Sequence, residues 1–435
     1  MTKLYVFFLV LLTTSVLADI RIIAEGVEPD QVVELERVVE EVGDQFFDLI
    51  GIENDSDSGK AAISLHINYS DYELADERLN AGRFKNNWAF SHPAAMESHV
   101  ALQPPVSMEV LEQVGLPLQT KIQIAHESVH LYFYKAFPNH PSHPDWLSEG
   151  VAVYVAERSI RSLGAMGPAE AEPWTSTEIV RVQKMFKNYP EMTIDSILAG
   201  SIEDVSSLTM YALHGLFIGW LDEIGAAEKI LQEARRFGGG SKYAQNLSSA
   251  VVEAIESAGI DDPDATFRAW VNGFEPQWEE VYRSMQTSND EWMHAAFASK
   301  NAICWNQEPL GEGDWAITGS LYVFNTGRSQ MNILLGRSTD GFVTVACSGD
   351  WGVTIFNYTS KDNNWNRLEV VEVPTMKFGR WIKFKISKRG NRLWVRMGKQ
   401  RAFKVEIGDL DLSGQWGLGV QKGSAGIWKD VQVDR

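Results

Sequence analysis

The segment HESVH, from His126 to His130, is followed after eighteen residues by Glu149 in the segment WLSEG. Residues four apart lie on one face of a helix, so His126 and His130 can present two imidazoles to a single ion. Glu127 lies about 100° further round that helix, where it can act on water without binding the ion. Two histidines and one carboxylate, with a fourth position left to water, form the ligand set of a catalytic zinc site. We therefore predict one Zn²⁺ per chain, bound by His126, His130 and Glu149.

The residues around this motif favour two helices. The stretch from Thr120 to Phe137 contains neither Gly nor Pro, and Phe133 and Phe137 share the face of the two histidines. WLSEG opens a second apolar run, from Val151 to Ala156. The alternative is a surface or core helix that carries two histidines without a metal.

HExxH followed after eighteen residues by Glu in W-x-x-E-G resembles the gluzincin metallopeptidases. Within them the chain is most similar to the aminopeptidase N family and to the shorter peptidase MA-like proteins. The resemblance extends over roughly residues 20 to 285 and is strongest from 120 to 156. It implies an α+β zincin-like catalytic domain, with zinc on His126, His130 and Glu149 and with Glu127 as the general base.

A zinc peptidase also needs a hydrogen-bond donor for the oxyanion that forms when water attacks the carbonyl. The aminopeptidase N family supplies a Tyr from a Y-x-K-G segment. The comparable segment here is Tyr211-Ala212-Leu213-His214-Gly215, which has one extra residue and His in place of Lys. The resemblance therefore implies Tyr211 as the donor, with His214 on the same helix face as the second candidate. Alternatively, both are packing residues.

The segment Ala94-Ala95-Met96-Glu97-Ser98 is comparable with the G-A-M-E-N strand of aminopeptidases, whose Glu binds the free N-terminus of the substrate. Ala replaces Gly here and Ser replaces Asn. Glu97 is thus a candidate amine anchor, and an aminopeptidase is an alternative function. The other interpretation is an edge-strand Glu. The large N-terminal β-domain of aminopeptidase N is missing from this chain.

Residues 1–18 have the pattern of a secretory signal peptide. Lys3 is the charged residue, Leu4 to Leu12 is apolar, and Val16 and Ala18 occupy the positions that a signal peptidase recognises. We expect cleavage after Ala18 and a secreted, periplasmic or extracellular protein. An uncleaved anchor is the alternative, although the apolar stretch is short for a membrane span. No later stretch approaches a span.

The rest of the chain divides by pattern into three parts. Residues 19–160 predict a small mixed sheet and the two zinc helices, with strands at 20–24, 61–68, 87–91 and 98–103 and an amphipathic helix at 28–49. Residues 161–290 predict a helical subdomain, with helices at 175–187, 208–224, 226–237, 248–258 and 263–283. Together, residues 19–290 form the expected metallopeptidase domain.

Residues 295–435 alternate in short strands separated by Gly, Asn and Asp turns, which predicts an all-β antiparallel sandwich. The segments that begin at Trp381, Trp394, Gly417 and Ile427 are similar to concanavalin-like and laminin-G-like jelly rolls. This resemblance implies a carbohydrate-binding accessory domain. Four tryptophans could stack on sugars, although tryptophan is more often a core residue: Trp305, Trp315, Trp351 and Trp365.

The C-terminal part of the chain differs in net charge from the rest. Residues 300–435 carry a net charge of +6, whereas the rest carries −25, giving −19 for the whole chain. A basic tail indicates contact with an anionic surface or polymer, or else a solvated basic face. The only two cysteines, Cys304 and Cys347, both lie in this tail. Export permits a disulfide between them, and the sequence leaves paired and unpaired states equally open.

From these patterns we expect a secreted zinc metallopeptidase that hydrolyses peptide bonds, with a peptide or protein as its substrate. The sandwich makes a polysaccharide or cell-surface glycan a candidate partner. We expect no nucleic acid partner and no membrane span in the mature chain. The rival interpretation is a non-catalytic surface or glycan-binding protein built on a peptidase-like scaffold.

Overall fold

The computed structural model describes residues 20–53, 61–85, 87–102, 111, 115–137, 143–164, 176–200, 202, 205–237, 242–275, 278–280, 284–286, 292–295, 302–323, 330–348, 352–361, 363–371, 379–421 and 424–435. The expected signal peptide lies outside these residues. Among the helices that are described, none is long and apolar enough to span a bilayer.

A four-stranded mixed sheet opens the described chain, in the order β1-β2-β4-β3. Its strands are β1 (Ile20–Ile23), β2 (Ala61–His66), β3 (Ala89–His92) and β4 (Glu97–Ala101). Strands β1, β2 and β4 run parallel, and β3 pairs antiparallel with β4 at one edge. The small mixed sheet expected from the sequence is therefore confirmed.

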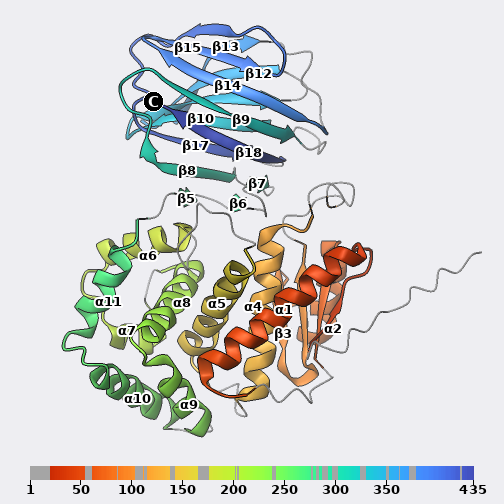
Figure 1. Cartoon of the computed structure of the whole chain (residues 1–435), viewed down its shortest axis with the longest axis vertical. Coiled ribbons are helices and arrows are strands. Elements are labelled where there is room, and N and C mark those ends of the chain that lie inside the picture. Colours follow the sequence, from red (N-terminus) through yellow and green to blue (C-terminus); the bar gives the residue numbers. More distant parts are fainter. Residues whose placement is uncertain are drawn as a thin grey trace, which may run out of the picture.

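Helices cover both faces of this sheet (Figure 1). On one face lies α2 (Tyr69–Asn80), where Tyr72 packs against Phe90 of β3 with ring centroids 5.4 Å apart. On the other face lie α1 (Pro29–Ile50) and α4 (Leu118–Ala136). The sequence did not predict α2, because Tyr72 and Ala75 are the only apolar side chains among its described buried residues and leave little helical periodicity.

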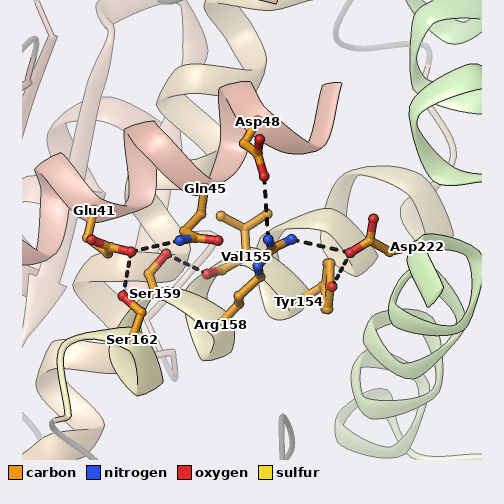
Figure 2. Close-up of polar contacts among 9 residues, drawn as sticks. All are labelled: Glu41, Gln45, Asp48, Tyr154, Val155, Arg158, Ser159, Ser162 and Asp222. Atoms are coloured by element: carbon orange, nitrogen blue, oxygen red, sulfur yellow. Dashed lines mark hydrogen bonds and ion pairs between the residues drawn. The ribbon is translucent and has the colours of Figure 1, made fainter. Parts of the chain in front are cut away.

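Helix α5 (Asp145–Ser162) lies between α4 and α8 (Ser207–Glu223) and is buried along most of its length. Polar contacts near its C-terminal end hold it to its neighbours (Figure 2). Arg158 contacts Asp222 of α8 at 3.2 Å and Asp48 of α1 at 3.4 Å. Tyr154 donates a hydrogen bond of 2.5 Å to Asp222. Helix α5 is thus fixed against helices that come from distant parts of the sequence.

The remaining helices of this region pack against α8 or against one another (Figure 1). They are α6 (Ser176–Asn188), α7 (Ile194–Leu198), α9 (Ala227–Phe237), α10 (Tyr243–Ser257) and α11 (Pro263–Asn272). The helix expected at 263–283 ends at Asn272, and the strand β5 (Trp278–Glu280) follows within its expected range. Gly273 is the C-cap residue, and its backbone N–H donates to the backbone oxygens of the last turn.

Within the described residues, the C-terminal part forms two seven-stranded antiparallel sheets. One has the order β13-β12-β11-β10-β17-β8-β5 and the other β16-β15-β14-β9-β18-β7-β6. The strands after β5 are β6 (Ser284–Gln286), β7 (Trp292–Ala295), β8 (Ala302–Pro309), β9 (Trp315–Val323), β10 (Gln330–Arg337), β11 (Gly341–Ser348), β12 (Gly352–Thr359), β13 (Asn364–Val371), β14 (Trp381–Arg389), β15 (Arg392–Met397), β16 (Phe403–Glu406), β17 (Gln415–Val420) and β18 (Ala425–Asp434).

The two sheets enclose a second hydrophobic core, separate from that of the helical region. Side chains that alternate along each strand, such as Val343, Val345 and Cys347 of β11, point into it. The antiparallel sandwich expected from the sequence is therefore confirmed. Its sheets extend back to Trp278, upstream of the expected start at residue 295.

The two cysteines are not bonded to each other. Cys347 lies on β11 and Cys304 on β8, and β10 and β17 separate these strands in the sheet. Three strand spacings amount to about 14 Å, which is beyond the reach of a disulfide. Both side chains are buried in the sandwich core, where they act as small apolar groups.

Candidate metal centre

The three predicted ligands meet at one point between α4 and α5. The Nε2 atoms of His126 and His130 are 3.1 Å apart. The Oε2 atom of Glu149 lies 3.2 Å from Nε2 of His126 and 3.5 Å from Nε2 of His130. Helix α4 supplies the two histidines from successive turns, and α5 supplies the carboxylate from its first turns.

These separations suit a zinc ion. A tetrahedral zinc with bonds of about 2.0–2.1 Å holds its ligand atoms about 3.3 Å from one another. The three observed distances, 3.1, 3.2 and 3.5 Å, fall on either side of that value. Two imidazole nitrogens and one carboxylate oxygen are also the donor types that a catalytic zinc site uses. The residues therefore fit the metal.

The electrostatics of the three side chains favour a positive charge between them. Burial opposes a charge on His130, but the carboxylate of Glu149 outweighs burial and raises the pKa of His130 to about 9. Burial likewise opposes the charge of Glu149, but the two histidines hold the pKa of Glu149 well below its usual value. Without a metal, a proton on His130 provides this positive charge, and a bound cation would replace that proton.

Glu127 follows His126 in α4 and is almost fully buried. Its carboxylate accepts a hydrogen bond of 2.5 Å from Ser91 Oγ on β3. Ser91 Oγ also lies 2.5 Å from Ser98 Oγ on β4, and these two serines are directly opposite in the sheet. The sheet edge thus fixes the orientation of Glu127. The sequence indicated no role for either serine in orienting Glu127, because a lone Ser in a short strand gives no signal of function.

Tyr211 and His214 lie on α8, which crosses α5 beside Glu149. A side chain at Gly150 would place its Cβ 2.8 Å from the backbone oxygen of His214, so this glycine permits the close approach of the two helices. Burial and the carboxylates of Glu149, Asp145 and Glu127 raise the pKa of Tyr211 to about 12. The phenol is therefore protonated at neutral pH and can donate a hydrogen bond.

His214 is only 2% exposed. Burial lowers the pKa of His214 to about 4 despite the opposing charge of Glu149, so its ring is neutral at pH 7. Neither ring nitrogen has a hydrogen-bond partner among the residues that the structure describes. A buried neutral imidazole without a partner retains the capacity to donate one hydrogen bond.

The structure places Glu97 away from this centre. Its neighbour Ser98 faces α4, where its hydroxyl donates to the backbone oxygen of Glu127 at 3.5 Å. Successive strand residues point to opposite faces, and Glu97 contacts Arg78 of α2 at 3.4 Å and His99 at 3.6 Å. Glu97 therefore lies on the α2 side of the sheet.

Comparisons with known proteins concern the sandwich. No family model matches the chain, and the comparison with curated proteins finds no match. Among solved structures, the chain is similar to the carbohydrate-binding module CBM66 from Bacillus subtilis, with 11% identity and a TM-score of 0.32 over 37% of this chain and 96% of that chain. It is also similar to the VIP36 exoplasmic/lumenal domain in its Ca²⁺/Man3GlcNAc-bound form (15% identity, TM-score 0.28, 37% and 86% of the chains) and to chicken galectin 2 (11%, 0.24, 28% and 89%). At these TM-scores we draw no function from the similarity.

Proposed function

We propose that this protein is a secreted zinc-dependent metallopeptidase that hydrolyses peptide bonds. The observation that supports the proposal best is the convergence of three donor atoms, from His126, His130 and Glu149, within 3.5 Å of one another, beside the second, buried carboxylate of Glu127. The order of a mixed sheet followed by α4 and α5 supports a zincin-like catalytic domain. The pattern of residues 1–18 supports export.

Different residues of the chain perform different steps of the proposed hydrolysis. A bound zinc ion would supply Lewis acidity, which lowers the pKa of water and polarises a carbonyl group. Glu127 takes the proton of the attacking water and passes it to the leaving amine. Ser91 holds the carboxylate of Glu127 in place through its hydrogen bond. Tyr211 donates to the oxyanion that forms from the carbonyl, and His214 is the second candidate for that role.

The aminopeptidase alternative receives no support from the position of Glu97. An anchor for a substrate amine has to face the same side of the sheet as the zinc ligands. Glu97 instead pairs with Arg78 and His99 on the α2 side. We therefore propose peptide-bond hydrolysis without a dedicated site for a free N-terminus.

Mass-spectrometric profiling of a mixed peptide library would test the proposal. The wild-type protein should cleave peptides, and a zinc chelator should stop the cleavage until zinc is restored. Glu127→Gln should lose most turnover, whereas the matched change Glu97→Gln should keep it. Failure of the zinc-loaded wild type to cleave any peptide, or full activity in Glu127→Gln, would overturn the proposal.

A second candidate function is glycan binding by the sandwich, with the helical region as a scaffold. It is favoured by a specific observation, a row of aromatic and polar side chains that crosses the outer face of one sheet. The most exposed aromatic of that row, Trp365, has 46% of its surface accessible. Both functions can reside in one chain, because the proposed zinc centre lies between α4 and α5, whereas this face lies on the sheet that begins with β13.

A further inference from the structure

The outer face of the sheet that begins with β13 carries a continuous aromatic ladder. Trp365 of β13 is directly opposite Tyr358 of β12, which is directly opposite Phe342 of β11. The ring centroids of Trp365 and Tyr358 are 4.8 Å apart, and those of Tyr358 and Phe342 are 5.0 Å apart. The three rings therefore form one apolar strip across three neighbouring strands.

Polar groups continue the strip across the next three strands, β10, β17 and β8. The Arg337 guanidinium lies 5.1 Å from the ring centroid of Trp305, and that ring lies 5.3 Å from Phe342. Arg337 also donates to Gln415 at 3.4 Å, and Gln415 donates to Gln307 at 2.6 Å. We call these seven residues the aromatic row: Trp365, Tyr358, Phe342, Arg337, Trp305, Gln415 and Gln307.

Gly417 of β17 provides the space that this arrangement needs. A Cβ at Gly417 would lie 2.9 Å from the ring of Trp305, so any side chain there would displace the indole. Trp305 itself is 3% exposed, whereas the other end of the row, Trp365, is 46% exposed. The row thus passes from a fixed, buried end to an open one.

The row is not part of the sandwich core. The core takes the alternate side chains of the same strands, such as Val343 of β11 and Ile355 of β12. Trp365 is exposed, and Tyr358 and Phe342 are half-buried, so the three rings form one partly accessible apolar patch. Contiguous apolar patches of this kind mark interaction sites more often than scattered apolar residues do. The row crosses six neighbouring strands, which corresponds to about 24 Å at the usual strand spacing. That length suits an extended chain rather than a single small molecule.

We propose that the aromatic row binds a polysaccharide chain that lies across the strands. Sugar rings have apolar faces, which can stack on Trp365, Tyr358 and Phe342, and hydroxyl groups at their rims. Arg337 and Gln415 offer donors at fixed positions for those hydroxyls, the combination of apolar lining and a few placed polar groups that ligand sites use. This inference rests on the glycan-binding candidate and is independent of zinc chemistry.

The chain offers a matched control on the opposite sheet. Trp381 of β14 is 37% exposed and lies with its ring 4.1 Å from the Lys429 ammonium. It is therefore an exposed tryptophan like Trp365, but it lies on the other sheet and outside the aromatic row. The variant Trp381→Ala tests whether the loss of any exposed tryptophan weakens binding.

Affinity electrophoresis of the full chain would test the proposal, in gels that each contain mannan, galactan, β-glucan, fructan or polygalacturonate. At least one neutral polysaccharide should retard the wild type. Trp365→Ala and Tyr358→Ala should each weaken that retardation about tenfold, the effect of losing a central aromatic contact. Trp381→Ala should bind like the wild type. Circular dichroism of each variant checks that the sandwich remains folded.

The proposal would be overturned if no polysaccharide retarded the wild type, or if the folded double variant Trp365→Ala/Tyr358→Ala bound like the wild type. Equal weakening of binding by Trp381→Ala would overturn it as well. Retardation by polygalacturonate alone would also overturn it, because this would assign binding to the basic charge of the tail. Glu127→Gln should bind polysaccharide like the wild type, so that failure of the peptidase proposal and failure of this one are distinguishable.

Discussion

The proposed zinc centre and the aromatic row are assembled in opposite ways. The three proposed zinc ligands come from two helices and lie between residues 126 and 149. The aromatic row comes from six strands and extends from residue 305 to residue 415. A motif within one helix can be recognised in the sequence from its periodicity. A row of residues across a sheet depends on strand order and register, which cannot be predicted from any one short segment.

Glu127→Gln should have the largest effect, and this effect should be confined to the proposed zinc centre. Loss of a general base typically lowers turnover by about 10² to 10⁴. The variant should keep its zinc, because Glu127 is not one of the three converging ligands. Steady-state kinetics on a cleaved peptide, together with metal analysis, checks this. If the variant lost its zinc as well as its turnover, Glu127 would instead be a ligand or a structural residue.

A smaller effect on the same centre is expected from Tyr211→Phe. Loss of one oxyanion donor lowers kcat by about 10² to 10³. Because the contact exists mainly in the transition state, KM should change little. Peptide kinetics over a range of substrate concentrations separates the two parameters. A wild-type kcat in Tyr211→Phe would transfer the donor role to His214, which His214→Phe would then reveal.

Protonation of His99, on strand β4, should destabilise the N-terminal region at acidic pH. Burial and then the neighbouring His66 lower the pKa of His99 to about 4, against 6.5 in the unfolded chain. The unfolded chain therefore binds more protons between pH 6.5 and pH 4, and the free energy of unfolding falls as the pH is lowered through that window. We expect a loss on the order of 1–3 kcal/mol. Urea unfolding of chelator-treated protein measures it, and His99→Gln should reduce the pH dependence, while the contribution of His214 remains. An unchanged slope in that variant would contradict the assignment.

The smallest predicted effect concerns Ser91, which orients Glu127 from the sheet edge. Ser91→Ala should lower kcat about tenfold, which is the effect expected from the loss of one hydrogen bond to a charged group. Ser91→Thr keeps a hydroxyl and is the matched control, which should restore most of the rate. Zinc content and KM should stay unchanged in both variants. A full rate in Ser91→Ala would show that α4 alone positions the carboxylate.

The sequence predicted that His126, His130 and Glu149 converge, because the pattern depends on spacing within one helix and on the start of the next. His126 and His130 are one helical turn apart, and Glu149 follows in the next helix, so little tertiary information was needed. The small sheet, most helices and the sandwich were predictable for the same reason. Their apolar positions recur with a period of 3.6 or 2 residues.

Residues whose position depends on tertiary structure were not predictable in this way. Strand alternation decides which face Glu97 occupies, and comparison with a motif could not give that register. Ser91 reaches Glu127 only because β3 pairs with β4 beneath α4. The separation of Cys304 and Cys347 follows from the order β11-β10-β17-β8, in which strands distant in sequence are neighbours.

The proposal that the HESVH helix and Glu149 form a zinc site can be tested most directly by elemental analysis of the purified chain. The wild type should contain one zinc ion per chain, and Glu127→Gln should contain the same amount. His126→Ala/His130→Ala should contain none, while the sandwich keeps its fold. Stoichiometric zinc in the double histidine variant, or no zinc uptake by the wild type, would contradict the assignment.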